Sequence, residues 1–97
     1  PSLGRVLANM AFVERLCAQQ LRRKIDRDVA RRKHDQRAAD QSRMEELQDS
    51  AFRHLDQSFE IFRANRHRRG EGNVYTIRGA LHLDRGELDK AEDVGRL

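Results

Sequence analysis

The densest basic cluster of this sequence that contains no acid lies in its second half. Arg63, Arg66, Arg68 and Arg69 occur there with His67 and without an acidic residue among them. Guanidinium groups at this density can bind carboxylates, phosphate or nucleic acid. Cations at the C-terminal end of a helix are also stabilised by its dipole, by about 0.3–1 kcal/mol each. The run therefore predicts either a helix end or a patch that binds an anion or an acidic partner.

The other reactive side chains do not form a catalytic or metal-binding pattern. The four histidines are scattered, and neither an HExxH motif nor a cysteine pair accompanies them. A GxSxG motif and a phosphate-binding glycine loop are both missing. The acids of Glu45-Glu46 and Glu92-Asp93 diverge around a helix, because sequence neighbours do not share a helix face. The patterns predict a protein that is not an enzyme and has no catalytic residue, no metal site and no cofactor.

The single cysteine, Cys17, lies among Val13, Leu16 and Leu21. This setting predicts a small buried apolar residue rather than a reactive thiol. One cysteine also excludes a disulfide within the chain.

The composition predicts one small helical domain with a thin core. The chain has 97 residues, of which 37% are hydrophobic and 37% charged, and its net charge is +4. A chain of this length buries about 65% of the surface that it exposes when unfolded. No run of 18 apolar residues and no signal segment occurs, so we expect a cytoplasmic protein without a membrane span. Much of the packing must come from five aromatic residues: Phe12, Phe52, Phe59, Phe62 and Tyr75.

The absence of Gly and Pro between Gly4 and Gly70 predicts long helices. Residues 26–43 are polar, and they contain either an exposed helical extension or, as we favour, a bend near residues 33–40. The fold class is thus all-α with antiparallel helical hairpins, and residues 1–69 form a long amphipathic hairpin. The first helix has an apolar stripe of Leu3, Val6, Leu7, Met10, Val13, Leu16, Cys17, Leu21 and Ile25, and the second has Met44, Leu47, Ala51, Leu55, Phe59 and Phe62.

The last segment carries a spaced set of aromatic and small residues. Tyr75 is followed by Gly79 and His82, then by a turn at Gly86 and by Ala91. This segment resembles the tetratricopeptide repeat, a 34-residue helix-turn-helix unit that begins Trp-x-x-Leu-Gly-x-x-Tyr and places a small Ala on its second helix. Tyr75 replaces the Trp of that pattern, and His82 replaces its Tyr.

The resemblance implies a fragment of a right-handed α-solenoid. Residues 70–97 would form a repeat-like hairpin truncated at its second helix, and residues 1–69 a degenerate or capping repeat. Helix packing would depend on Gly79, which faces Ala91 at the crossing, and on Gly86, which ends the first helix at a positive φ. In the family the concave surface receives the ligand, which implicates three residues in partner binding: Tyr75, Arg78 and His82.

The leading functional hypothesis is a non-catalytic protein-protein interaction module. The resemblance suggests a piece of a larger cytosolic signalling or regulatory protein, in which repeats act as sensor or scaffold arms. Its partner would be another polypeptide, including further repeats of the same protein or a second copy. The alternatives are a helical dimerisation domain and a basic nucleic-acid-binding arm. Nucleic acid is disfavoured, because the basic triplets 22–24 and 31–33 would lie on opposite sides of a helix.

Overall fold

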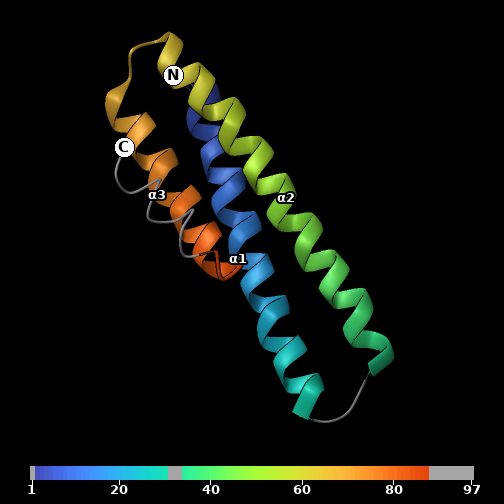
Figure 1. Cartoon of the computed structure of the whole chain (residues 1–97). Helices are drawn as coiled ribbons and strands as arrows, with labels where there is room; N and C mark the ends of the chain where they lie inside the picture. The colour runs from blue at the N-terminus through green and yellow to red at the C-terminus, as the bar shows by residue number, and fades with distance from the viewer. Residues whose placement is uncertain (1, 31–33, 88–97) are drawn as a thin grey trace.

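The chain folds into three helices. The computed structural model describes residues 2–30 and 34–87, and within them it contains helices α1 (Ser2–Ala30), α2 (His34–Ala64) and α3 (Arg68–Asp84) but no strand (Figure 1). The predicted all-α class is therefore confirmed at this level.

Helices α1 and α2 lie side by side and run in opposite directions (Figure 1). Near one end of the pair, the Ser58 hydroxyl donates a hydrogen bond of 2.7 Å to the carbonyl oxygen of Gly4. Towards the other end, Lys24 Nζ lies 2.8 Å from Asp40 Oδ2. Because α2 already begins at His34, residues 34–40 of the expected bend are helical; residues 31–33 lie outside the described part.

A short turn separates α2 from α3. Arg66 has a left-handed backbone there, with φ 54°. His67 is the N-cap of α3, and its Nδ1 accepts a 2.9 Å hydrogen bond from the Gly70 amide. The helix break thus falls at residues 65–67, and Gly70, the first glycine after the long helical stretch, lies inside α3.

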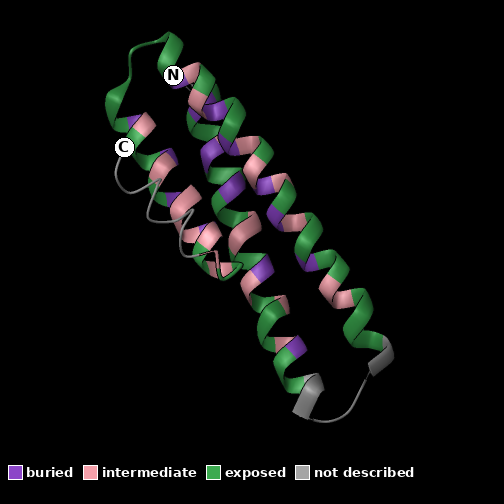
Figure 2. Cartoon of the chain, viewed as in Figure 1, coloured by how far each residue is buried: buried purple, intermediate pink, exposed green. Residues whose placement is uncertain are grey.

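The main core joins all three helices. Figure 2 shows buried positions along the sides of the helices that face one another. Of the apolar stripe predicted for α2, Ala51, Leu55 and Phe62 are buried in this core and Phe59 packs against it, whereas Met44 and Leu47 belong to a smaller cluster with α1. Both predicted segments, 1–69 and 70–97, contribute residues to this core. Its buried members are Ala8, Ala11, Ala51, Leu55, Phe62, Val74, Ile77 and Leu81.

Helix α1 packs through its small residues, and this corrects the sequence-based prediction. Gly4, Ala8 and Ala11 are buried, whereas most of the large apolar residues expected in the core are exposed. Phe12, which was expected to pack, is 45% exposed, and Cys17 is exposed rather than buried. Small side chains let α1 approach its neighbours closely, so the larger ones face outward. Leu7 and Leu21 are half-buried, and only Ile25 of the predicted stripe is fully buried.

Helix α3 ends just before Gly86, as the sequence predicts. Arg85 is its C-cap, and Gly86 follows with φ 74°, the left-handed conformation that glycine adopts without steric cost. Gly79 is half-buried within α3. Ala91 lies outside the described residues, and so does the predicted contact between Gly79 and Ala91.

Candidate protein-binding surface

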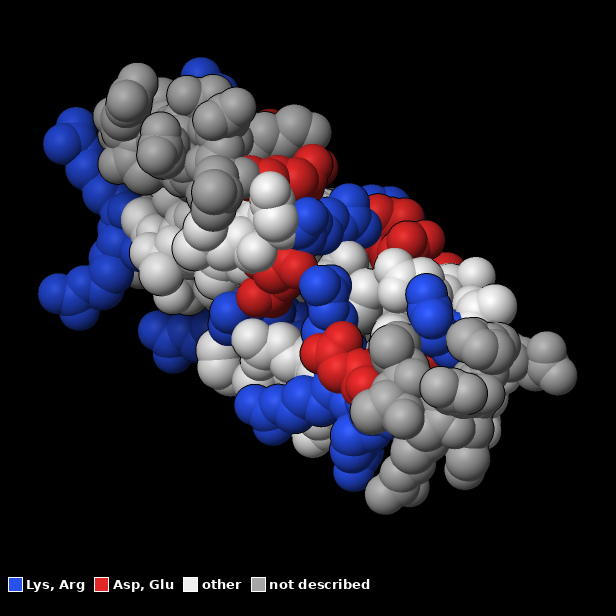
Figure 3. Space-filling view, turned by 60° about the horizontal axis from the view of Figure 1, so that its bottom comes forward, with Lys and Arg blue, Asp and Glu red and all other residues white. Residues whose placement is uncertain are grey.

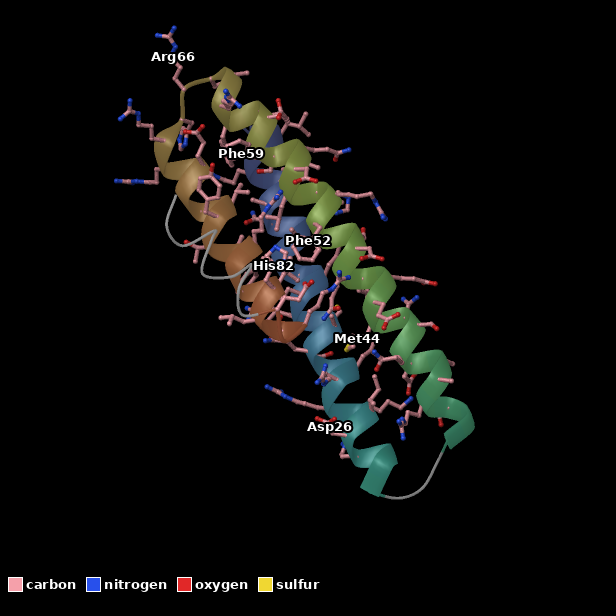
Figure 4. All side chains as sticks on the ribbon, viewed as in Figure 1. Asp26, Met44, Phe52, Phe59, Arg66 and His82 are labelled. Atoms are coloured by element: carbon pink, nitrogen blue, oxygen red, sulfur yellow. The ribbon has the colours of Figure 1, made fainter. Side chains whose placement is uncertain are left out.

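Two of the three predicted partner-binding residues contact aromatic rings of α2. The Tyr75 ring lies 5.2 Å from that of Phe59, and the His82 ring lies 4.8 Å from that of Phe52, measured between centroids. Figure 4 shows His82 of α3 close to Phe52 of α2. His82 Nδ1 is also 3.1 Å from Glu87 Oε1. These rings therefore help to hold α3 against α2.

The third predicted residue, Arg78, also pairs with α2. Its Nη2 donates a hydrogen bond to Asp56 Oδ1, and its side chain is 28% exposed. Burial lowers the pKa of the Arg78 guanidinium below its ordinary value. The group nevertheless stays charged at neutral pH, because a guanidinium is not deprotonated there. A ligand on α3 would meet Arg78 already engaged with a carboxylate.

Two residues at the end of α3 tie it to both other helices, a role that no sequence pattern indicated. Arg15 of α1 donates two hydrogen bonds to the Asp84 carboxylate, at 2.8 and 3.3 Å. The next residue, Arg85, donates to Gln48 Oε1 at 2.9 Å and to Asp49 Oδ1 at 2.5 Å on α2. Sequence indicated only a turn here, because the partners lie far away along the chain.

A polar groove opens beyond the end of α3. It encloses about 400 Å³, and its lining includes Arg22, Met44, Gln48, Asp84 and Arg85. Asp84 and Arg85 already bind protein groups, and Gln48 accepts the bond from Arg85. The polar groups of the groove, which include charges of both signs, therefore hold α3 in place and are not arranged around a ligand.

The predicted basic patch lies around the turn between α2 and α3. Arg63 belongs to the last turn of α2, as expected, but Arg68 and Arg69 begin α3, where the helix dipole disfavours cations. All four arginines of the patch are exposed, and Figure 4 shows Arg66 pointing away from the helices. On the face that Figure 3 shows, Lys and Arg side chains are interspersed with Asp and Glu side chains instead of forming one basic stripe.

The most unusual surface lies on α1. Four large apolar side chains, which we call the outer stripe, follow one side of this helix: Leu3, Val6, Met10 and Val13, which are 60%, 49%, 42% and 55% exposed. Leu16, three residues after Val13, borders the stripe and is 41% exposed, whereas Phe12, which is 45% exposed, lies about 160° around the helix from Met10. The outer stripe and Leu16 together form the apolar face of α1.

The apolar face of α1 is as large as the apolar patches that monomeric proteins use for binding. A fully exposed large side chain presents roughly 150–200 Å², so the five exposed fractions correspond to about 400 Å² of apolar area. The largest apolar patch of a monomeric protein measures about 300–600 Å² and is often functional. The apolar face of α1 lies within that range and is the candidate binding surface.

Comparison of the chain with protein-family models, with curated proteins and with solved structures found no match. The resemblance to the tetratricopeptide repeat therefore stays a prediction. Within residues 2–30 and 34–87, no group of three His, Cys, Asp or Glu side chains is placed to hold a metal ion. None of the helices described combines the length and apolar character needed to cross a membrane.

Proposed function

We propose that this chain is a non-catalytic protein-protein interaction module in which the apolar face of α1 binds another polypeptide. The observation that carries the proposal is the outer stripe, whose four large side chains are 42–60% exposed. Burying such a face is favourable by about 25 cal/mol per Å² of apolar area removed from water. A partner with a complementary apolar surface would therefore be bound chiefly by the hydrophobic effect.

The repeat resemblance supports the same class of function. On this proposal α3 is the first helix of a tetratricopeptide-like unit within a right-handed solenoid, and Gly86 opens the turn to the second helix. The positive φ of Gly86 supports this arrangement. The family's use as sensor or scaffold arms supports a place in a larger cytosolic signalling or regulatory protein.

The proposal changes the role expected for the residues of α3. Tyr75, Arg78 and His82 contribute to holding α3 on α2, through the two ring contacts and the Arg78–Asp56 pair. Their exposed parts remain available to a partner, but the larger apolar area lies on α1. We therefore place the main contact on α1.

Site-specific photocrosslinking in the cells that express the protein tests this function. Benzoylphenylalanine would replace either Val13 in the outer stripe or Gln57, an exposed residue of α2 that serves as the matched control. We expect polypeptide adducts from position 13 that disappear when Met10→Glu is added, and few from position 57. Equal yields from both positions, or adducts that persist with Met10→Glu, would contradict the proposal.

A further inference from the structure

We propose that the polypeptide bound by the apolar face of α1 is a second copy of this chain, paired antiparallel through α1. The inference rests on the proposed function and names the partner. Its first support is that the stripe is self-complementary in the antiparallel direction. Leu3, Val6, Met10 and Val13 are separated by three, four and three residues, and these intervals read the same in both directions.

A two-fold axis near the level of residue 8 uses this symmetry. It sets Leu3 against Val13 of the second copy, and Val6 against its Met10, so all four levels of the stripe contain only apolar side chains. A two-fold interface requires such a patch, because the same surface must serve both subunits. Spacings of three and four residues are also those with which paired helices interlock their side chains.

The charges beyond the stripe favour the antiparallel direction. The same spacing continues through Cys17, Gln20 and Lys24 to Arg27, which is exposed, whereas Lys24 pairs with Asp40 of α2. A parallel pair in register would place the two Arg27 residues side by side on helices whose axes are about 8–10 Å apart. In the antiparallel pair the two Arg27 residues lie about 57 Å apart along the helices, at 1.5 Å per residue. Since the Debye length is about 8 Å at physiological salt, their repulsion is then screened.

The area of the face fits a reversible dimer. The outer stripes of two copies together remove at most roughly 700 Å² of apolar surface from water, and the polar rim adds to this. Stable interfaces bury about 1,200–2,000 Å² in total, so the pair belongs to the smaller interfaces of weak and transient complexes. We therefore expect a dimer that dissociates at micromolar concentrations.

Sedimentation equilibrium of the purified chain tests whether the partner is a second copy. We expect the average mass to rise from 11.3 kDa towards twice this value as the concentration passes through the micromolar range. Met10→Glu should abolish the rise, because two carboxylates would enter the apolar interface. Leu83→Glu is the matched control: Leu83 is 55% exposed on α3, outside the stripe, and its substitution should leave the dimer intact.

Disulfide crosslinking with diamide tests the direction. Leu3→Cys and Val13→Cys, each prepared with Cys17→Ser, should crosslink only when the two variants are mixed. Each variant alone places its two cysteines about 15 Å apart along the pair, beyond the 7 Å limit between Cα atoms for a disulfide. The unaltered chain should not crosslink through Cys17, because its two copies lie about 27 Å apart along the helices.

The outcomes separate this inference from the proposed function. A chain that stays monomeric at all concentrations, while residue 13 forms adducts with a different polypeptide in cells, overturns the second copy as partner and leaves the interaction module standing. Efficient Cys17–Cys17 crosslinking overturns the antiparallel direction. A monomer that also lacks adducts at residue 13 overturns both proposals.

Discussion

Phe62 lies between two glycines that belong to different helices. A Cβ built on Gly70 of α3 would be 2.5 Å from the Phe62 ring, and one built on Gly4 of α1 would be 3.0 Å from it. Real Cβ atoms do not approach a ring carbon to 2.5 Å, so the ring would have to move from its site. Glycine therefore lets α1 and α3 meet the same aromatic side chain of α2.

Gly70→Ala should destabilise the fold, although alanine favours helices. Overpacking a core typically costs about 1–3 kcal/mol, while the change from Gly to Ala in a helix contributes about 0.5–1 kcal/mol in the opposite direction. We expect a net loss of roughly 1–2 kcal/mol in the free energy of unfolding, measured by urea denaturation.

Gly72→Ala is the control for this change. Gly72 lies in the same helix, and nothing lies within 4 Å of the position that its Cβ would take. The substitution should leave stability unchanged or raise it by up to about 1 kcal/mol. Equal effects of the two substitutions on the free energy of unfolding would show that the Phe62 ring does not restrict the size of the side chain at position 70.

Helix α3 is fixed at both ends. His67 caps its first turn. At its other end, Asp84 binds Arg15 of α1 while Arg85 binds Gln48 of α2. The Arg15 and Asp84 side chains are only 21% and 18% exposed, so water screens their pairing less than that of a surface pair. Consecutive residues thus anchor one helix end to two different helices.

A double-mutant cycle of Arg15→Met and Asp84→Asn should detect this anchor. Charge-assisted hydrogen bonds are stronger than neutral ones, and we expect a coupling of about 1–2 kcal/mol in the free energy of unfolding. A cycle is needed because Asp84→Asn also removes a negative charge that the C-terminal end of the helix dipole disfavours.

Amide hydrogen exchange should locate the effect of Asp84→Asn. We expect faster exchange in the last turns of α3, since that end loses its attachment to α1. Asp40→Asn, which breaks the Lys24–Asp40 pair between α1 and α2, should leave the amides of α3 unchanged. Unaltered exchange in α3 after both substitutions would contradict the anchoring role.

The three helices together form a long and thin fold. Its Cα atoms extend over 50 × 27 × 13 Å. A body of this shape has little interior, so α1 turns its small residues inward and presents its apolar face to the surroundings. Because so thin a fold buries little apolar surface, a partner that covers the apolar face of α1 would add substantially to its stability.

Dimerisation through α1 should make thermal stability depend on protein concentration. Association with the folded state raises the apparent Tm by mass action, and the rise grows with concentration. We expect the Tm measured by circular dichroism to increase by several degrees over a hundredfold range of concentration. Met10→Glu should remove this dependence. A Tm of the unaltered chain that is constant over the same range would count against the dimer.

Sequence predicted the helices better than their contacts. The lack of Gly and Pro between Gly4 and Gly70 indicated long helices, and the spacing of large residues identified the buried side of α2. The exposed face of α1 was misassigned to the core, since Leu, Val and Met outweigh Ala and Gly in any apolar pattern. No local signal indicated that Asp84 and Arg85 would bind α1 and α2.

Three features follow from residues a few positions apart along the chain: its helical class, the buried side of α2 and the end of α3 before Gly86. The side of α1 that packs depends instead on the approach of distant helices. Two neighbouring helices must come close to α1, and the small residues Gly4, Ala8 and Ala11 permit this approach whereas Val6 and Met10 do not. That choice leaves the apolar face of α1 exposed, and with it the surface on which the proposed function depends.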